Sequence, residues 1–122
     1  MSESSIETTA LKTLRVAVVE DDATLRLFMR KLIEKPGSGF EFVGAWETAE
    51  EAVKPIVEST PHVIVVDLEL PKVSGMELIR QLSPRMSNTA FVVLTIHDDP
   101  EKVFAALRAG ANGYLLKTAK PN

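Results

Sequence analysis

The sequence has no cysteine, which excludes disulfide bonds, thiolate chemistry and cysteine-based zinc sites. It also lacks any apolar run near the roughly 20 residues of a membrane span, and its N-terminus has no basic and apolar regions of the signal-peptide kind. Basic side chains are not in excess: 14 Lys and Arg against 17 Asp and Glu give a formal charge of −3, which offers no electrostatic footprint for nucleic acid. These absences predict a cytoplasmic domain without a membrane span.

The composition that remains favours a single folded domain. Apolar residues form 45% of the 122 residues, enough to argue against global disorder, and the length suits one domain. Residues 1–13 are rich in Ser, Thr and Glu and show no apolar period, so we expect a flexible tail there. The folded domain is then expected at residues 14–122.

Short apolar runs alternate with helical patterns along this domain. The runs that predict strands are residues 14–19, 40–45, 63–66, 91–94 and 114–116. Between successive runs, apolar residues recur at the spacing of one helix face, which predicts four helices. Strict alternation of this kind is typical of right-handed crossovers in a parallel sheet. The sequence therefore predicts an α/β fold with a doubly wound, five-stranded parallel sheet of the flavodoxin-like type.

Local signals mark where the middle two helices begin. Thr48 with Glu51, and Ser74 with Glu77, have the spacing of capping boxes. Pro55 lies inside the second helical pattern and removes a backbone N–H donor. We therefore expect the second helix to be kinked or short.

Carboxylates, a hydroxyl and an ammonium group follow the predicted strands at their carboxyl ends, where doubly wound sheets carry their sites. Clustered carboxylates repel one another unless a hard cation lies between them, and oxygen ligands suit Mg²⁺ or Mn²⁺. A carboxylate can also attack phosphorus to form an aspartyl phosphate, whose oxygens a cation, a lysine and a hydroxyl neutralise. The residues at these strand ends are Glu20, Asp21, Asp22, Asp67, Thr95 and Lys117.

Four blocks of the sequence resemble the signature blocks of bacterial two-component response-regulator receiver domains. Each block alone is weak, but all four in order, each at a strand end, are highly specific. The resemblance covers about residues 14–117, and the last two blocks are most similar to receivers attached to helix-turn-helix output domains. The blocks are residues 18–22, 67–75, 92–95 and 110–117.

The resemblance implies a metal site around a phosphoacceptor. Asp67 would accept the phosphoryl group. Asp21 would bind Mg²⁺ directly, Glu20 would bind it through water, and the backbone carbonyl of Glu69 would be the third protein ligand. Asp22 lies one place beyond the acidic pair of the family, and we expect it to cap the first helix.

The resemblance also implies switch and tuning residues. Thr95 would bind a phosphoryl oxygen and change position with phosphorylation, Lys117 would form an ion pair with the phosphate, and Tyr114 would be an aromatic rotamer switch. Receivers commonly have a small residue directly after the switch threonine, and the larger Ile96 at this position would narrow access to the phosphoryl group. Glu69 and His97 either tune attack by water or are inert loop residues.

The sequence departs from the family at its C-terminal end. Lys117 is followed by Thr118 where many receivers have proline, so whether this peptide bond is cis stays open. A fifth helix would begin only near Thr118, and the sequence ends at Asn122. We therefore expect a missing or truncated fifth helix and exposed apolar surface beside the first helix.

The implied function is a signalling switch whose output is binding rather than turnover. Its partner would be a histidine kinase or phosphotransfer protein, and DNA would be bound only through an output domain outside this chain. Whether the domain forms a homodimer stays open. The alternatives are a phosphatase of the haloacid dehalogenase type, a flavin- or nucleotide-binding domain, and a receiver that never accepts phosphate.

Overall fold

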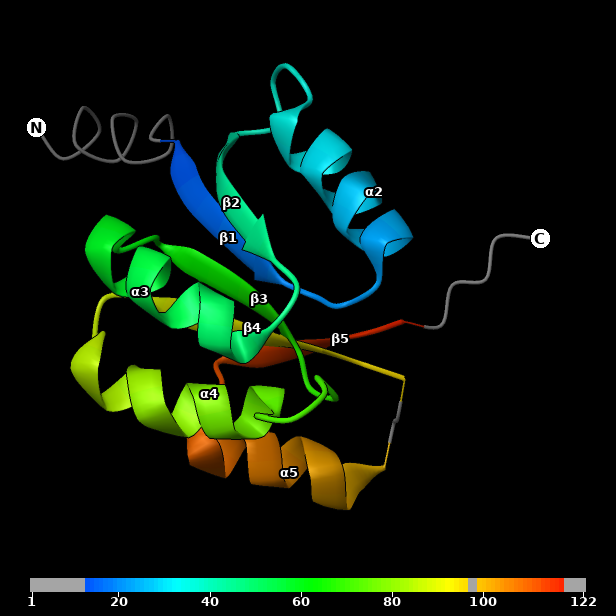
Figure 1. The fold of residues 1–122 in the computed structure, drawn as a ribbon, viewed down its shortest axis with the longest axis vertical. Coiled ribbons are helices and arrows are strands. Elements are labelled where there is room, and N and C mark those ends of the chain that lie inside the picture. The colour runs from blue at the N-terminus through cyan, green and yellow to red at the C-terminus, as the bar shows by residue number, and fades with distance from the viewer. Residues whose placement is uncertain (1–12, 97–98, 118–122) are drawn as a thin grey trace, which may run out of the picture.

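The computed structural model describes residues 13–96 and 99–117. Its five strands form one parallel sheet with the order β2-β1-β3-β4-β5 (Figure 1). The strands are β1 (Leu14–Val19), β2 (Phe40–Trp46), β3 (Val63–Asp67), β4 (Ala90–Thr95) and β5 (Gly113–Leu116). The predicted doubly wound α/β fold is confirmed. The predicted tail, His97 and the Lys117–Thr118 bond lie outside the described residues.

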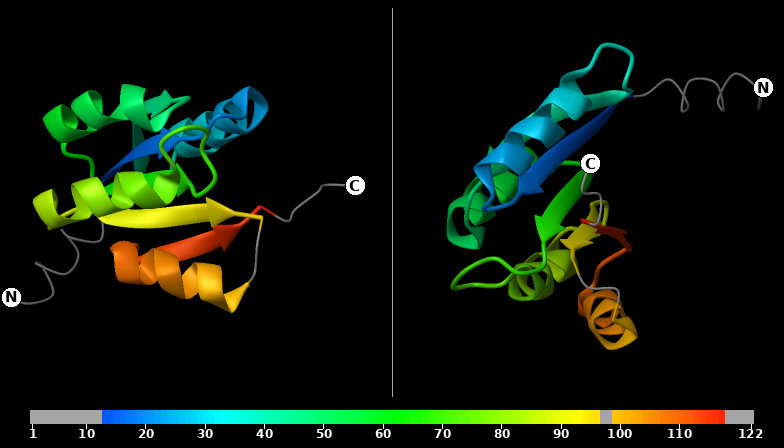
Figure 2. Two further views of the ribbon diagram at one scale, coloured as in Figure 1. Left: turned by 60° about the horizontal axis from the view of Figure 1, so that its bottom comes forward. Right: turned by 90° about the vertical axis from the view of Figure 1, so that its right-hand side faces the viewer.

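Four α-helices connect the strands and cover both faces of the sheet. They are α2 (Ala23–Glu34), α3 (Ala49–Ser59), α4 (Gly75–Leu82) and α5 (Pro100–Ala109), with a short 3-10 helix at Ser83–Arg85. Figures 1 and 2 show α2 on one face of the sheet and α3 and α4 on the other, with α5 beside α4. Within the described ranges no helix follows β5, and no helix has the length and apolar character to cross a membrane.

Side-chain caps begin the helices where the sequence predicts. Oδ1 of Asp22 accepts hydrogen bonds from two backbone N–H groups in the first turn of α2, at 2.9 and 3.2 Å. The N–H groups of Glu51 and Glu77 donate to the hydroxyls of Thr48 and Ser74, both at 3.1 Å. Each cap satisfies donors that the first helical turn leaves without an intrahelical partner.

The second predicted helix differs from the expectation. α3 has 11 residues and continues through Pro55, so the prediction of a short helix was wrong, whereas the alternative of a kink stays a prediction. Its face formed by Ala49, Ala52 and Ile56 is buried against the sheet. Burial of this face outweighs the loss of the one hydrogen bond that proline cannot donate.

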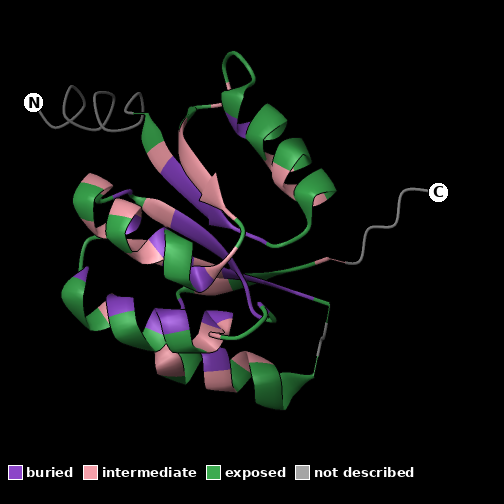
Figure 3. Ribbon diagram, viewed as in Figure 1, coloured by how far each residue is buried: buried purple, intermediate pink, exposed green. Residues whose placement is uncertain are grey.

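Alternation along the strands divides the core into two parts. On β1, Ala17 and Val19 point into the large cluster under α3, α4 and α5, whereas Val16 and Val18 point into a smaller one under α2. The central strands β1 and β3 are consequently buried on both faces (Figure 3). Their carboxyl ends are fixed in a rigid part of the molecule, which is what a precise polar site needs.

The face that carries α2 keeps apolar surface. An apolar groove of about 230 Å³ runs between α2 and the sheet, from Met29 on the helix to Leu115 on β5. Leu115 is 52% exposed, and Phe28 and Leu32 of α2 are exposed as well. The predicted apolar surface beside the first helix is thus confirmed in the described part of the chain.

Candidate functional site

Three carboxylates meet at the carboxyl edge of the sheet. β1 and β3 are neighbours with Val19 paired to Val66, so the residues that follow, Glu20 and Asp67, lie side by side. One carboxylate oxygen each from Glu20, Asp21 and Asp67 lies within 4.8 Å of the others. Glu20 and Asp67 are buried, whereas Asp21 is exposed. The convergence predicted from the strand ends is observed for these three residues.

Glu20 is the most constrained member of the cluster. Its backbone N–H donates to the carbonyl of Trp46 at 2.9 Å, and its Oε2 accepts from the N–H of Asp22 at 3.0 Å. Within the part of the chain that the structure describes, its Oε1 is buried without a well-formed hydrogen bond, although Nζ of Lys117 lies 2.9 Å away. A buried acceptor left in this state fits a site that receives a cation, and a donor set of oxygens alone fits Mg²⁺ or Mn²⁺.

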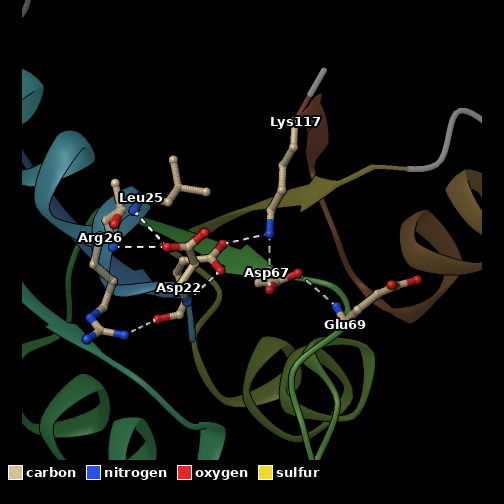
Figure 4. A network of polar contacts seen from close by, with 8 residues as sticks. Asp22, Leu25, Arg26, Asp67, Glu69 and Lys117 are labelled. Atoms are coloured by element: carbon tan, nitrogen blue, oxygen red, sulfur yellow. Dashed lines mark hydrogen bonds and ion pairs between the residues drawn. The ribbon is translucent and has the colours of Figure 1, made fainter. Parts of the chain in front are cut away.

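Lys117 lies between two carboxylates. Its Nζ is 2.9 Å from Oε1 of Glu20 and 3.2 Å from Oδ2 of Asp67 (Figure 4). Its backbone N–H donates to the carbonyl of Thr95 at 2.8 Å, which ties the end of β5 to the end of β4. These contacts hold the ammonium group beside the carboxylates of Glu20 and Asp67.

The charges of this cluster shift two pKa values. Burial raises the pKa of the Glu20 carboxyl and the charge of Asp67 raises it further, although Lys117 and the N–H of Asp22 oppose the shift. Burial alone would lower the pKa of Lys117, but its contact with Glu20 and the charge of Asp67 outweigh burial and raise it. Lys117 therefore remains a cation at neutral pH.

Both oxygens of Asp67 have protein partners. Oδ2 faces Lys117, and Oδ1 accepts from the backbone N–H of Glu69 at 2.9 Å. The start of α4 lies against the same residue, since a Cβ atom built on Gly75 would be 2.1 Å from the backbone carbonyl oxygen of Asp67. The loop after β3 thus fixes the carboxylate from one side, and Lys117 contacts it from the other.

The other predicted residues lie around this centre. Thr95 is buried at the end of β4, next to β3, where Leu94 pairs with Asp67. Ile96 follows it and is 62% exposed, and Tyr114 on β5 is 45% exposed. His97 cannot be placed because it lies outside the described residues. The roles of all these residues, and the backbone carbonyl of Glu69 as a ligand, stay predictions.

Two further cations contact the site without having been predicted. Nη1 of Arg26, on α2, donates to the backbone carbonyl of Glu20 at 2.8 Å. Nζ of Lys102, on α5, lies 3.5 Å from Oε2 of Glu69. Neither contact follows a helical or strand spacing: Arg26 reaches back across a turn to a backbone carbonyl, and Lys102 reaches Glu69 only because α5 packs nearby. No pattern in the sequence therefore predicts these two contacts.

A family model decides the classification of the chain. Residues 16–122 match the response regulator receiver domain. The chain belongs to this family. The family is neither the haloacid dehalogenase type nor a flavin-binding domain, the two enzyme and cofactor alternatives that the sequence left open.

Individual receiver-containing proteins are similar over most of the chain. The transcriptional regulatory protein DegU of Brevibacillus brevis is 35% identical over 104 residues, which are 85% of this chain and 44% of that protein. The chain likewise spans half of the transcriptional regulatory protein LiaR of Bacillus subtilis. It thus covers about half the length of these curated relatives.

Solved receiver structures share the fold. A LuxR-family two-component response regulator from an Aurantimonas species superposes with a TM-score of 0.81 at 32% identity, covering 90% of this chain and 78% of that one. The receiver domain of a putative NarL regulator from Mycobacterium tuberculosis gives a TM-score of 0.81 at 27% identity, covering 89% and 87%. Both likenesses agree with the flavodoxin-like architecture described above.

Proposed function

We propose that Asp67 accepts a phosphoryl group from the phosphohistidine of a histidine kinase or phosphotransfer protein, in a reaction that requires Mg²⁺ or Mn²⁺. The observation that carries this proposal is the buried carboxylate of Asp67, which lies in one cluster with Glu20, Asp21 and Lys117. The domain acts as a switch that promotes its own phosphorylation and dephosphorylation, not as an enzyme with a separate substrate.

The acidic cluster holds the divalent ion. Asp21 is exposed and binds it directly, Glu20 acts through water, and Asp67 and the backbone carbonyl of Glu69 complete the protein ligands. When bound, the ion supplies positive charge that neutralises phosphoryl oxygens. The carboxylate of Glu20 is already held by the N–H of Asp22 and the ammonium group of Lys117, and its backbone N–H by Trp46, so no reorganisation is needed at that side.

Phosphoryl transfer replaces one bond to phosphorus by another. A carboxylate oxygen of Asp67 attacks phosphorus in line, the bond from phosphorus to the histidine nitrogen breaks, and an acyl phosphate forms. Lys117 already faces Oδ2 of Asp67 at 3.2 Å and forms an ion pair with the new phosphoryl group. Thr95, at the end of the neighbouring strand, donates its hydroxyl to a phosphoryl oxygen.

Phosphorylation then shifts the population between two packings of the domain. Thr95 moves toward the phosphoryl group, and Tyr114, which is 45% exposed, turns inward. The surface formed by α5 and β5 changes with them, and this change alters which partner the domain prefers. Ile96 and the side chain of Glu69, together with His97, which follows Ile96 in the sequence, set how fast water removes the phosphoryl group.

The output is the control of transcription. The relatives named above are transcription regulators of which this chain spans about half, so we assign DNA binding to an output domain and not to residues 14–122. The histidine kinase partner and a cytoplasmic location follow from the same assignment. Residues 1–13 are assigned to a tail outside the receiver domain.

Labelling with acetyl phosphate tests the proposal. Wild-type protein with Mg²⁺ should gain the mass of one phosphoryl group, and the gain should vanish in excess EDTA. Asp67→Asn, which keeps the size of the side chain, should not be labelled. Asp22→Asn is the matched control: it neutralises a neighbouring carboxylate, but asparagine also caps helices, so labelling should persist. Full labelling of Asp67→Asn would refute the assignment.

A further inference from the structure

We propose that Arg26 is a positioning residue for the metal-binding segment after β1, a role that rests on the function proposed above. Nη1 of Arg26 donates to the backbone carbonyl of Glu20 at 2.8 Å, in a partly buried contact (Figure 4). This carbonyl belongs to the peptide unit that joins Glu20 to Asp21. By holding the plane of that peptide, Arg26 sets the direction in which the backbone presents Asp21.

The need for such a contact follows from the difference between the two acidic residues. Glu20 is buried and is held by the carbonyl of Trp46 and the N–H of Asp22. Asp21 is exposed, so packing does not hold its side chain, and the orientation of its backbone decides where its carboxylate points. A direct ligand placed on an unsupported peptide would have to be ordered each time the ion binds, which weakens binding.

The positive charge of Arg26 and its proposed positioning role have opposite effects on Mg²⁺ affinity. A guanidinium group beside an acidic cluster repels a divalent cation, so its charge alone lowers the affinity for Mg²⁺. Removing Arg26 therefore has opposite effects under the two explanations. Loss of positioning weakens Mg²⁺ binding, whereas loss of repulsion alone strengthens it. The sign of the change is the decisive quantity.

Arg30 provides a matched control on the same helix. Arg26 and Arg30 both line a surface groove of about 470 Å³ between α2 and β2, together with Trp46. Arg30 pairs with Glu34 at 3.2 Å and lies 4.8 Å from the ring centroid of Phe42, so its contacts lie away from the acidic segment. Arg30→Met removes the same charge from the same groove without removing a bond to Glu20.

A Mg²⁺ titration of the whole chain measures the effect. Isothermal titration calorimetry gives the Kd directly, and the fluorescence of Trp46, the single tryptophan, whose backbone carbonyl accepts from the N–H of Glu20, is a second signal. At fixed ionic strength, Arg26→Met should raise the Kd for Mg²⁺ by about three- to tenfold, the range for one organising hydrogen bond. Arg30→Met should leave the Kd unchanged or slightly lower, and Arg26→Lys, which keeps a donor and the charge, should recover part of the affinity.

A second readout needs no metal. In metal-free protein, Arg26→Met and Arg26→Lys should shift the backbone amide resonances of Asp21 and Asp22, with the larger shift in the methionine variant, whereas Arg30→Met should not. A Kd for Arg26→Met equal to or below that of wild type, or unchanged amides in both Arg26 variants, would overturn the inference. If wild-type protein shows no saturable Mg²⁺ binding, the proposed function fails instead, and the amide shifts still decide whether Arg26 holds the peptide.

Discussion

Nζ of Lys117 lies closer to Oε1 of Glu20, at 2.9 Å, than to Oδ2 of Asp67, at 3.2 Å. The ammonium group therefore neutralises the deeply buried Glu20 as well as facing the proposed phosphoacceptor. Lys117→Met should destabilise the metal-free protein by about 1–3 kcal/mol, because it leaves a buried charge without a partner. Urea unfolding in EDTA measures this loss. Adding Glu20→Gln to Lys117→Met should restore part of the stability, and strict additivity of the two changes would argue against a direct coupling.

Glu20→Gln alone should separate stability from metal binding. Because the pKa of Glu20 is raised, the folded protein favours the neutral carboxyl, and its charged form costs stability at neutral pH. Metal-free wild-type protein should become more stable as the pH falls from neutral toward the ordinary pKa of 4.5, and Glu20→Gln should remove that gain. The same variant should bind Mg²⁺ more weakly. Urea unfolding at several pH values and a Mg²⁺ titration check the two effects, and tighter Mg²⁺ binding would contradict the ligand role.

Gly75 is expected to be intolerant of a side chain. Its Cβ position lies 2.1 Å from the backbone carbonyl oxygen of Asp67, so Gly75→Ala forces α4 away from the loop after β3. We expect a loss of about 1–3 kcal/mol in unfolding free energy, despite the better helix propensity of alanine. Labelling by acetyl phosphate should fall as well. Gly113→Ala is the control, since its Cβ would meet nothing within 4 Å, and an equal loss there would dismiss the steric explanation.

Ile96 should slow the loss of the phosphoryl group. It is 62% exposed and directly follows Thr95, and we propose that its side chain restricts the approach of water to the phosphoryl group. Ile96→Ala should shorten the half-life of the labelled protein several-fold and leave its unfolding free energy nearly unchanged. The decay of the phosphorylated mass after removal of acetyl phosphate measures the half-life. A half-life equal to that of wild type would assign Ile96 to an inert loop.

The fold was predictable because local signals agree with one another. The buried strand at residues 63–66 has no polar alternation, and the caps at Thr48 and Ser74 mark helix starts, so element type and order follow from short windows of sequence. The prediction of a short helix failed at Pro55, where a local rule competes with burial of a helix face. Packing of this helix face against the sheet decided that case, and a rule based on the local sequence does not take such packing into account.

The acidic cluster was predictable for a related reason. In a parallel sheet the carboxyl ends of the strands share one edge, and the order of a flavodoxin-like sheet places β1 next to β3, so the residues that follow these two strands are neighbours. Arg26 was not predictable in the same way, because its partner is a backbone carbonyl six positions earlier across a turn. The contact of Lys102 with Glu69 depends likewise on how α5 docks.

The hydrogen bond from the N–H of Lys117 to the carbonyl of Thr95 has a mechanical consequence. It links Thr95, at the end of β4, to Lys117, which directly follows β5. A displacement of the end of β4 carries both groups together. Under the proposed function, the hydroxyl and the ammonium group would therefore approach a newly formed acyl phosphate together and not one after the other.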